Sequence, residues 1–339
     1  MKPVTRPSTP ADAAAIAALF AEARMGLDPD HLHWKYWQPR ADWPRPRSFV
    51  IASGSELIAH AGIVPGTCAW GTRRETIIHV IDWVARAGTG AGVMLMKHVG
   101  QMAGALIAIG GGAVTRSILP HIGFRPAGSA TVYARPLFPL RILRTGPAWK
   151  LLPRLARATW RRSAPAARDP DWQVRRLGGD EVGQIAAVLP LPTHGSTVTE
   201  RNADQLRYLL ACPIVPMQLY AVSQAGRLRG YFLLALAPGQ VRIADCWLDS
   251  DESEDWRAMI LCAVELAQDQ PQAAEVVIWA SDPLLATALR ACGFYARFES
   301  PVRVRPSGND TGPAGPLRVQ MLDNDAAFLF YQGRNEYWG

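Results

Sequence analysis

The fold of this chain is decided by one stretch, Trp83-Val84-Ala85-Arg86-Ala87-Gly88-Thr89-Gly90-Ala91-Gly92-Val93-Met94-Leu95-Met96. An apolar strand is predicted over 77–84, and alternating glycines lead from it directly into a helix predicted over 93–102. The three glycines carry no Cβ, so backbone N–H groups can come close to a bound group, and the helix adds the positive end of its dipole. The stretch therefore predicts an anion site that best suits a pyrophosphate.

The sequence also repeats itself about one domain length apart. Residues 107–136 can be laid on 277–306 without a gap, and 81–83 can be laid on 244–246. This aligns Gly123-Phe124 with Gly293-Phe294, Asp82 with Asp245, and Arg135-Pro136 with Arg305-Pro306. Such a period predicts two copies of one α/β domain. The predicted segments are a first copy over 1–138, a basic linker with an amphipathic helix over 139–171, and a second copy with a C-terminal extension over 172–339.

The two copies differ at the glycine loop. The second copy has Leu248-Asp249-Ser250-Asp251-Glu252-Ser253-Glu254-Asp255 there, with five carboxylates. A pyrophosphate would meet like charges at this position, although acidic residues also favour a helix N-terminus without any ligand. We expect only the first copy to bind the anion.

The remaining patterns of the first copy predict the element order β-α-(α)-β-β-β-α-β-α-β. The expected elements are a strand at 4–6, a helix from 10 to about 24, an aromatic segment at 31–37, a hairpin of 49–52 and 57–64, the strand 77–84, the helix 93–102, a strand at 106–109, a short helix at 114–122 and a closing strand at 130–134.

This order, with a glycine loop after the fourth strand and Ile122-Gly123-Phe124 after the last helix, resembles the GNAT superfamily of acyl-CoA-dependent N-acyltransferases. The segment Trp34-Lys35-Tyr36 and the tail Arg135-Pro136-Leu137 are similar to tandem members linked to bacterial polysaccharide genes. The resemblance covers about residues 3–137 and, more faintly, 172–306. It implies two tandem domains, each with a mixed, mostly antiparallel sheet flanked by helices. It also implies acetyl-CoA as acyl donor and a small-molecule amine, such as an amino sugar, as acceptor.

The acyl-CoA site that the resemblance implies begins at the end of the strand and includes the loop. Its residues are Trp83, Val84, Ala85, Arg86, Gly88, Thr89, Gly90, Ala91, Gly92 and Val93, and the carbonyl of the thioester would be polarised by the N–H of Val84 or a neighbour. Two positions depart from the family pattern. The family's Arg/Gln position holds Ala85 or Ala87, with Arg86 displaced by one, and the tyrosine that often serves as general acid is replaced by Leu119 and, in the second copy, Leu289.

Three residues are the main candidates for proton transfer, and Glu75 is a fourth. Asp82 and His79 lie on the strand before the loop, where Glu75 is a further possible base, and His121 lies near the position of the missing tyrosine. Each has a structural alternative. Asp245 matches Asp82 in the copy without the loop, which favours a structural role; His79 fits a buried strand histidine and His121 an exposed helix histidine. The aromatic segment 31–37 is either an acceptor pocket or a core-facing helix.

Composition limits the remaining possibilities. The chain carries a formal net charge of +7, and eleven Lys/Arg stand against two Asp between Arg135 and Arg176. Within this region Trp149–Arg162 has the composition of an interfacial helix, so it is either a contact with anionic membrane or a docked interdomain helix. No motif favours nucleic acid. The five scattered cysteines favour buried thiols over a metal or disulfide site, and no leader or membrane span is recognisable. We therefore expect a cytoplasmic N-acyltransferase, or alternatively a non-catalytic acyl-CoA-binding or scaffold protein.

Overall fold

The computed structural model describes residues 2–23, 29–70, 73–144, 152–153, 155–156, 159–160, 169–190, 197–307 and 317–328. The chain divides into two compact units, and each unit is assembled from several segments of the sequence. Unit 1 comprises 1–128, 191–200 and 301–317, and unit 2 comprises 129–190, 201–300 and 318–339.

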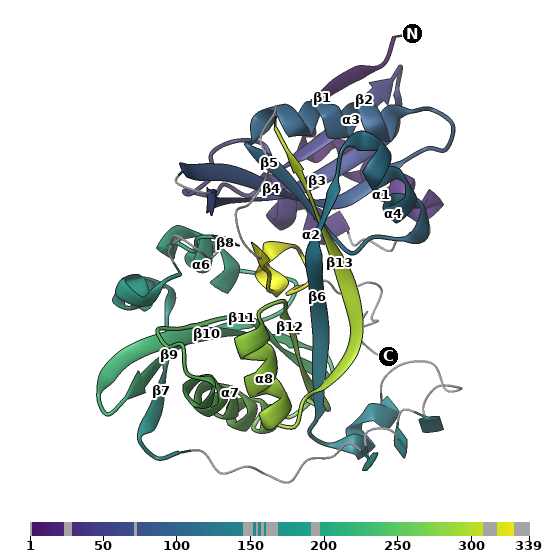
Figure 1. Ribbon diagram of the computed structural model, residues 1–339. Coiled ribbons are helices and arrows are strands. Elements are labelled where there is room, and N and C mark those ends of the chain that lie inside the picture. Colours follow the sequence, from purple (N-terminus) through teal and green to yellow (C-terminus); the bar gives the residue numbers. More distant parts are fainter. Residues whose placement is uncertain are drawn as a thin grey trace. The chain divides into compact units, whose positions relative to one another are not determined.

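Unit 1 (Figure 1) contains one parallel pair among the strands that the structure describes, β4 with β5, and its other neighbouring pairs are antiparallel. Its strand order is β1 (Val4–Pro7), β2 (Ser48–Ser53), β3 (Glu56–Trp70), β4 (Arg73–Ala85), β5 (Ala105–Ile109) and part of β13 (Tyr295–Pro306). Its helices are α1 (Ala13–Glu22), α2 (Pro29–Leu32), α3 (Ala91–Val99) and α4 (Ala113–Ile118).

The two faces of this sheet carry separate apolar cores. On one face, Ile16 and Phe20 of α1 belong to the same buried cluster as Val50 of β2. On the other face, Leu95 of α3 shares a cluster with Ile51. Since neighbouring strand residues point to opposite faces, consecutive residues of β2 serve both cores. This arrangement fixes α3, and with it the glycine loop, on one face of β4.

Unit 2 is similar: among its described strands β11 and β12 form the one parallel pair, and the other neighbouring pairs are antiparallel. Its strand order is β6 (Arg125–Pro136), β12 (Glu275–Ala280), β11 (Gln240–Leu248), β10 (Arg227–Ala237), β9 (Met217–Gln224) and β7 (Trp172–Leu177). Its helices are a 3-10 helix (Gly179–Val188), α6 (Ala203–Leu210), α7 (Ser253–Gln268) and α8 (Pro283–Ala291). The short strand β8 (Thr197–Val198) belongs to the segment 191–200 of unit 1 and pairs with β14 (Leu317–Arg318). Buried side chains of α7 and α8 form one core with β11 and β12.

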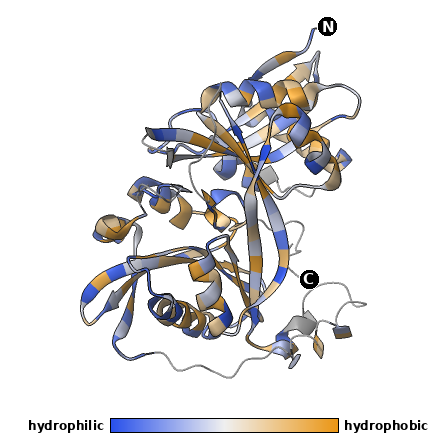
Figure 2. Ribbon diagram, in the orientation of Figure 1, coloured by the Kyte–Doolittle hydropathy of each residue, from blue (hydrophilic) through white to orange (hydrophobic). Residues whose placement is uncertain are grey.

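The two halves of the sequence exchange their last strands. Residues 131–136 of β6 pair with β12 in unit 2, whereas 302–306 of β13 pair with β5 in unit 1. Both strands alternate in hydropathy, as the bands along their ribbons show (Figure 2); in β13, buried Val302 and Val304 alternate with Arg303 and Arg305. The sequence segment 1–138 therefore contributes β6 to unit 2, and the segment 172–339 contributes part of β13 to unit 1.

The observed elements follow the predicted order, and the mixed, mostly antiparallel α/β architecture is confirmed. The second half runs in a similar sequence of strands and helices, and both Gly123 and Gly293 adopt left-handed backbone angles after the last helix. The predicted helix 114–122 is shorter than expected. It becomes a 3-10 helix at Leu119–Ile122, where Pro120 lacks the N–H that an α-helix would use.

None of the five cysteines forms a disulfide, and all five are buried. Within the described ranges, no helix is long and apolar enough to span a bilayer.

Candidate functional site

The glycine loop joins the end of β4 to the start of α3 with its glycines exposed and in left-handed conformations. Gly88 has φ +75° and Gly90, the residue before the helix, has φ +65°. A Cβ placed on either residue would meet nothing within 4 Å, so the space in front of both backbones is open. The first amides of α3 lack intrahelical acceptors, and Ala91 N–H donates to Thr89 Oγ1 at 3.3 Å. Exposed backbone N–H groups at the start of a helix can donate hydrogen bonds to an anion.

Gly92 has a different role from the two exposed glycines. It is buried, its carbonyl accepts a hydrogen bond from Trp83 Nε1 at 3.1 Å, and a Cβ there would lie 3.1 Å from the Cβ of Ala85. This close contact fastens the first turn of α3 to β4. The guanidinium of Arg86 does not point freely at the loop, because it forms ion pairs with Glu22 and Glu56.

A gap opens between β4 and β5 beside this loop. The two parallel strands are paired only at 77–79 with 105–107, although β4 continues to Ala85. The Arg86 N–H donates to Ile58 O of β3 at 2.9 Å. Because backbone groups alternate along a strand after the bulge, Val84 also faces β3, whereas the C=O of Trp83 and both backbone groups of Ala85 face the gap. The N–H expected to polarise a thioester carbonyl would therefore belong to a neighbour of Val84, because the Val84 N–H faces β3.

Asp82 lies in a β-bulge at the edge of this gap. His60 pairs with Val84 and Gly62 with Ile81, so Asp82 and Trp83 together face the single residue Ala61. Asp82 has φ +49°, a conformation that Asp tolerates better than most residues. The bulge explains why Ile81 and Val84, three positions apart, belong to the same core.

The Asp82 carboxylate is held by the aromatic segment 31–37. It forms a buried ion pair with Lys35 and accepts a hydrogen bond from the Tyr36 hydroxyl; the Lys35 and Asp82 side chains are only 5% and 2% exposed. Burial raises the pKa of Asp82, but the Lys35 charge and the hydrogen bonds from Lys35 and Tyr36 outweigh it and leave the pKa below its ordinary value. Tyr36 reaches this position over Gly62, where a Cβ would come within 2.7 Å of the ring. Residues 33–37 form a π-helical turn with Trp34 and Tyr36 buried, so this segment is a core element.

His60 fixes the backbone of the bulge, and the sequence analysis did not identify it. Its Nδ1 lies 2.9 Å from the Asp82 carbonyl oxygen and its Nε2 lies 2.8 Å from Ser48 Oγ, which accepts from Ser8 Oγ at 2.6 Å. A neutral ring satisfies this chain by donating from Nδ1 and accepting at Nε2. Complete burial lowers the pKa of His60 to about 4.

We expect this histidine to make unit 1 sensitive to acid. The unfolded chain binds a proton at the ordinary pKa of 6.5 and the folded protein only near pH 4, so the free energy of unfolding falls as the pH drops through this window. The shift corresponds to about 3 kcal/mol. Urea unfolding between pH 7.5 and 4.5 should show a smaller loss in His60→Gln, which can donate to Asp82 and accept from Ser48. The exposed control His33→Gln should behave like wild type; equal slopes in all three proteins would contradict the assignment.

The other two catalytic candidates lie in different environments. His79 is buried on β4 at the last β4–β5 pair, where the gap begins, and its Nε2 lies 3.4 Å from Thr199 Oγ1. His121 is exposed on the 3-10 helix after α4, and within the described ranges no side chain hydrogen-bonds it. Leu119 and Leu289 are both buried in the cores, so neither position offers a proton donor.

Unit 2 holds Asp245 in the same manner as unit 1 holds Asp82. The β10–β11 register shifts next to it, and the carboxylate accepts from Tyr231 Oη at 2.5 Å and from Arg201 at 2.9 and 3.0 Å. One cation and one tyrosine hydroxyl thus bind each aspartate. In the acidic loop, Asp255 is engaged by Arg229 at 2.9 Å and by Ser250 Oγ at 2.7 Å.

A cavity of about 700 Å³ also lies in unit 1, between the end of α3 and the end of β13. Lys97, Arg125 and Arg305 line it, and none of the predicted acyl-CoA residues does.

No protein-family model and no curated protein matches this sequence. Among solved structures, the chain is similar to a GCN5-related N-acetyltransferase from Anabaena variabilis ATCC 29413, with a TM-score of 0.60 and 13% identity over 91% of this chain and 73% of that one. It is similar to a second GCN5-related N-acetyltransferase, from Kribbella flavida, with a TM-score of 0.55 and 15% identity over 90% and 71%.

It is also similar to N-myristoyltransferase of Saccharomyces cerevisiae with bound myristoyl-CoA, with a TM-score of 0.59 and 12% identity over 93% and 79% of the two chains. At these identities the likeness shows the fold, which is the fold of GCN5-related N-acetyltransferases.

Proposed function

We propose that unit 1 binds an acyl-CoA, in the first instance acetyl-CoA, and transfers its acyl group to the amine of a small molecule. One observation carries the proposal: a glycine loop with open, left-handed backbone meets the start of α3 beside a gap between two diverging parallel strands. The loop suits the pyrophosphate, and the gap suits a narrow chain that bears amides. The structural neighbours include N-acetyltransferases and an enzyme with bound myristoyl-CoA, which supports this class of donor.

The backbone of β4 offers the groups that such a donor needs. The C=O of Trp83 and both backbone groups of Ala85 point towards the gap, where they can pair with amides of the donor or with its thioester carbonyl. An N–H aimed at that carbonyl stabilises the negative charge that develops on the oxygen during attack. The bulge at Asp82 sets the angle of these groups, because it interrupts the β3–β4 ladder just before them.

In the reaction, the C–N bond forms as the C–S bond breaks; the amine loses a proton and the thiolate gains one. We assign proton acceptance to His79, because it lies at the closed end of the gap and an imidazole nitrogen is suited to proton transfer near neutral pH. We assign Asp82 a positioning role, because its carboxylate is ion-paired and has a lowered pKa. With Leu119 buried, the thiolate takes its proton from water or from exposed His121.

Release of free thiol tests this function. With acetyl-CoA and a panel of amines that includes amino sugars, we expect amine-dependent thiol release that is lost in His79→Ala and retained in His33→Ala. The second candidate, a non-catalytic acyl-CoA-binding or scaffold protein, is favoured by the absence of a tyrosine at Leu119 and Leu289. Binding of one acetyl-CoA without thiol release for any amine would decide for this alternative.

We also propose that the two halves are copies of one domain. Within the linker 139–171, we propose that the stretch 149–162 contacts anionic membrane. Much of the linker lies outside the described residues, but two of its described side chains, Leu152 and Trp160, are 75% and 90% exposed. The sequence surrounds them with Arg154, Arg157, Arg161 and Arg162. An apolar anchor within a basic segment is typical of a helix that lies on a membrane surface.

Co-sedimentation with vesicles checks the linker. We expect binding to phosphatidylglycerol vesicles at low salt that weakens as ionic strength rises, since each basic residue near the surface contributes about 1 kcal/mol and salt screens it. The variant with all four arginines changed to Ser should stay in the supernatant. If wild type stays there too, the linker is a docking element between the units.

A further inference from the structure

Unit 2 contains a gap like the one in unit 1, and the chain itself fills it. The parallel strands β11 and β12 pair at 240–243 with 275–278, and β11 then continues to Leu248. Cys246 lies on β11 beyond the last pair, and Ser281 directly follows the end of β12. Both contact the C-terminal segment.

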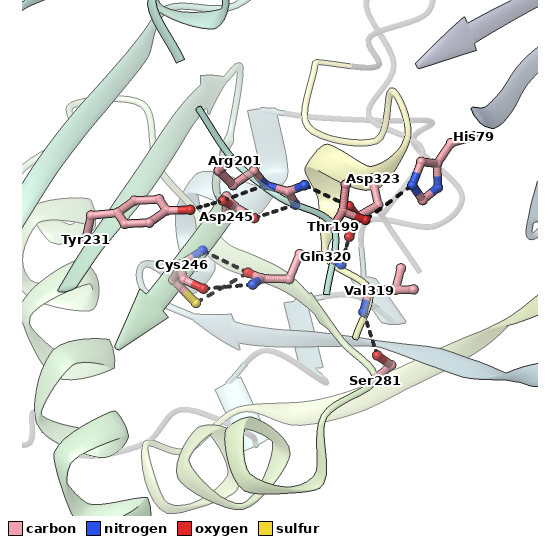
Figure 3. A network of polar contacts seen from close by, with 10 residues as sticks. All are labelled: His79, Thr199, Arg201, Tyr231, Asp245, Cys246, Ser281, Val319, Gln320 and Asp323. Atoms are coloured by element: carbon pink, nitrogen blue, oxygen red, sulfur yellow. Dashed lines mark hydrogen bonds and ion pairs between the residues drawn. The ribbon is translucent and has the colours of Figure 1, made fainter. Parts of the chain in front are cut away.

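The contact consists of hydrogen bonds to both sides of the gap (Figure 3). Gln320 Oε1 accepts from Cys246 N–H at 2.8 Å and Gln320 Nε2 donates to the Cys246 carbonyl oxygen at 2.7 Å. On the other side, Val319 N–H donates to Ser281 Oγ at 2.7 Å. The side-chain amide of Gln320 thus pairs with the otherwise unpaired edge of β11 as another strand would.

Cys246 corresponds to Trp83 of unit 1. The repeat aligns the two residues, and the Asp249 N–H donates to Arg229 O at 2.9 Å as the Arg86 N–H donates to Ile58 O. In both units, therefore, the C=O of the same strand residue points into the gap. The proposed function assigns this group in unit 1 to a donor amide, and in unit 2 the Gln320 amide already binds it.

The rest of the segment is anchored by buried polar contacts within unit 2. Arg318 forms an ion pair with Asp282 and lies over the rings of Trp247 and Trp256, at 4.7 and 4.9 Å from their centroids. Arg201 binds Asp323 at 2.9 Å while it also binds Asp245 (Figure 3). This arginine therefore connects the segment to the β10–β11 register shift beside Asp245.

The segment also buries its apolar residues, and the side chain of Arg242 binds a backbone carbonyl near its C-terminal end. Met321 and Leu322 are at most 2% exposed, and Arg242 donates to Ala326 O at 3.0 Å. Burial of apolar side chains stabilises the docked segment more than a surface contact would.

We propose that the gap between β11 and β12 is a ligand groove whose ligand is the chain's own segment 318–328. The segment makes the amide contacts that a bound molecule would make, so unit 2 is permanently occupied and unit 1 alone is open to a donor. Only the comparison with Trp83 rests on the proposed function. The docking of the segment is tested without any acyl-CoA, so the docking proposal and the proposed function of unit 1 can fail separately.

The thiol of Cys246 reports on this docking, since Gln320 lies 3.4 Å from its sulfur. Under native conditions we expect N-ethylmaleimide to leave Cys246 unlabelled in wild type. In Gln320→Leu, which leaves the Cys246 backbone groups without partners, the labelling rate at Cys246 should rise about tenfold or more. Cys262, buried on α7, is the internal reference, and Gln268→Leu on the same unit is the matched control.

Hydrogen exchange on unmodified protein keeps the test decisive if Gln320→Leu fails to fold. Amides of residues 319–326 should exchange slowly, in step with β11. Exchange of this segment at the rate of an unstructured peptide would overturn the proposal. So would labelling of Cys246 at the same rate in wild type and in folded Gln320→Leu.

Discussion

Changing Gly90 to aspartate is expected to abolish acetyl-CoA binding. The residue has φ +65°, which strains any residue with a Cβ, and the new carboxylate would stand in the open space where the first amides of α3 converge. A carboxylate next to a pyrophosphate in this partly screened site costs several kcal/mol, so we expect affinity to fall by about a hundredfold or more. Isothermal calorimetry of wild type should give one acetyl-CoA per chain.

The chain supplies a matched control in Gly226. This residue also has a positive φ, +80°, and a Cβ added to it would meet open space, but it lies in the β9–β10 turn of unit 2. Gly226→Asp introduces the same charge and a similar strain and should bind acetyl-CoA like wild type. Equal loss in both variants would point to general destabilisation, and two bound equivalents in wild type would contradict both the single site and the occupied groove of unit 2.

The glycine loop and the repeat were sufficient to predict the element order, because strand alternation, glycine runs and helix spacing are local properties of the sequence. The strand exchange could not be predicted in this way. Strands β6 and β13 have matching alternation and both end in Arg-Pro, so either could complete either sheet. Which strand pairs with β5 depends on the path of the whole chain.

The candidate site was predicted in outline, but its supporting side chains were not. Asp82 stood out, yet a regular strand gives no sign of the bulge that turns its carboxylate towards Lys35. A lysine inside an aromatic run and a histidine inside the apolar strand 57–64 were visible signals for buried polar partners. Gln320 had no such signal, because the C-terminal extension has no counterpart in the first copy.

Removing the Lys35 charge is expected to destabilise unit 1 strongly. In Lys35→Met the Asp82 carboxylate would remain buried without its cation, and breaking a buried pair from one side typically costs about 3–5 kcal/mol. Thermal and urea unfolding should both show this loss. The double variant Lys35→Met/Asp82→Asn removes both charges, and asparagine tolerates the left-handed backbone of residue 82 and can still accept from Tyr36. We expect it to recover most of the stability.

The same double variant decides between the two roles of Asp82. If the carboxylate only positions the bulge, the folded double variant should keep kcat for acyl transfer within about tenfold of wild type, with the acidic limb of its pH–rate profile unchanged. If Asp82 instead accepts the proton from the amine, kcat should fall by about 10²–10⁴ and that limb should flatten, although the protein is stable. The second unit favours the first outcome, because Asp245 is bound by a cation and a tyrosine in the same way at the edge of a groove that the chain itself fills.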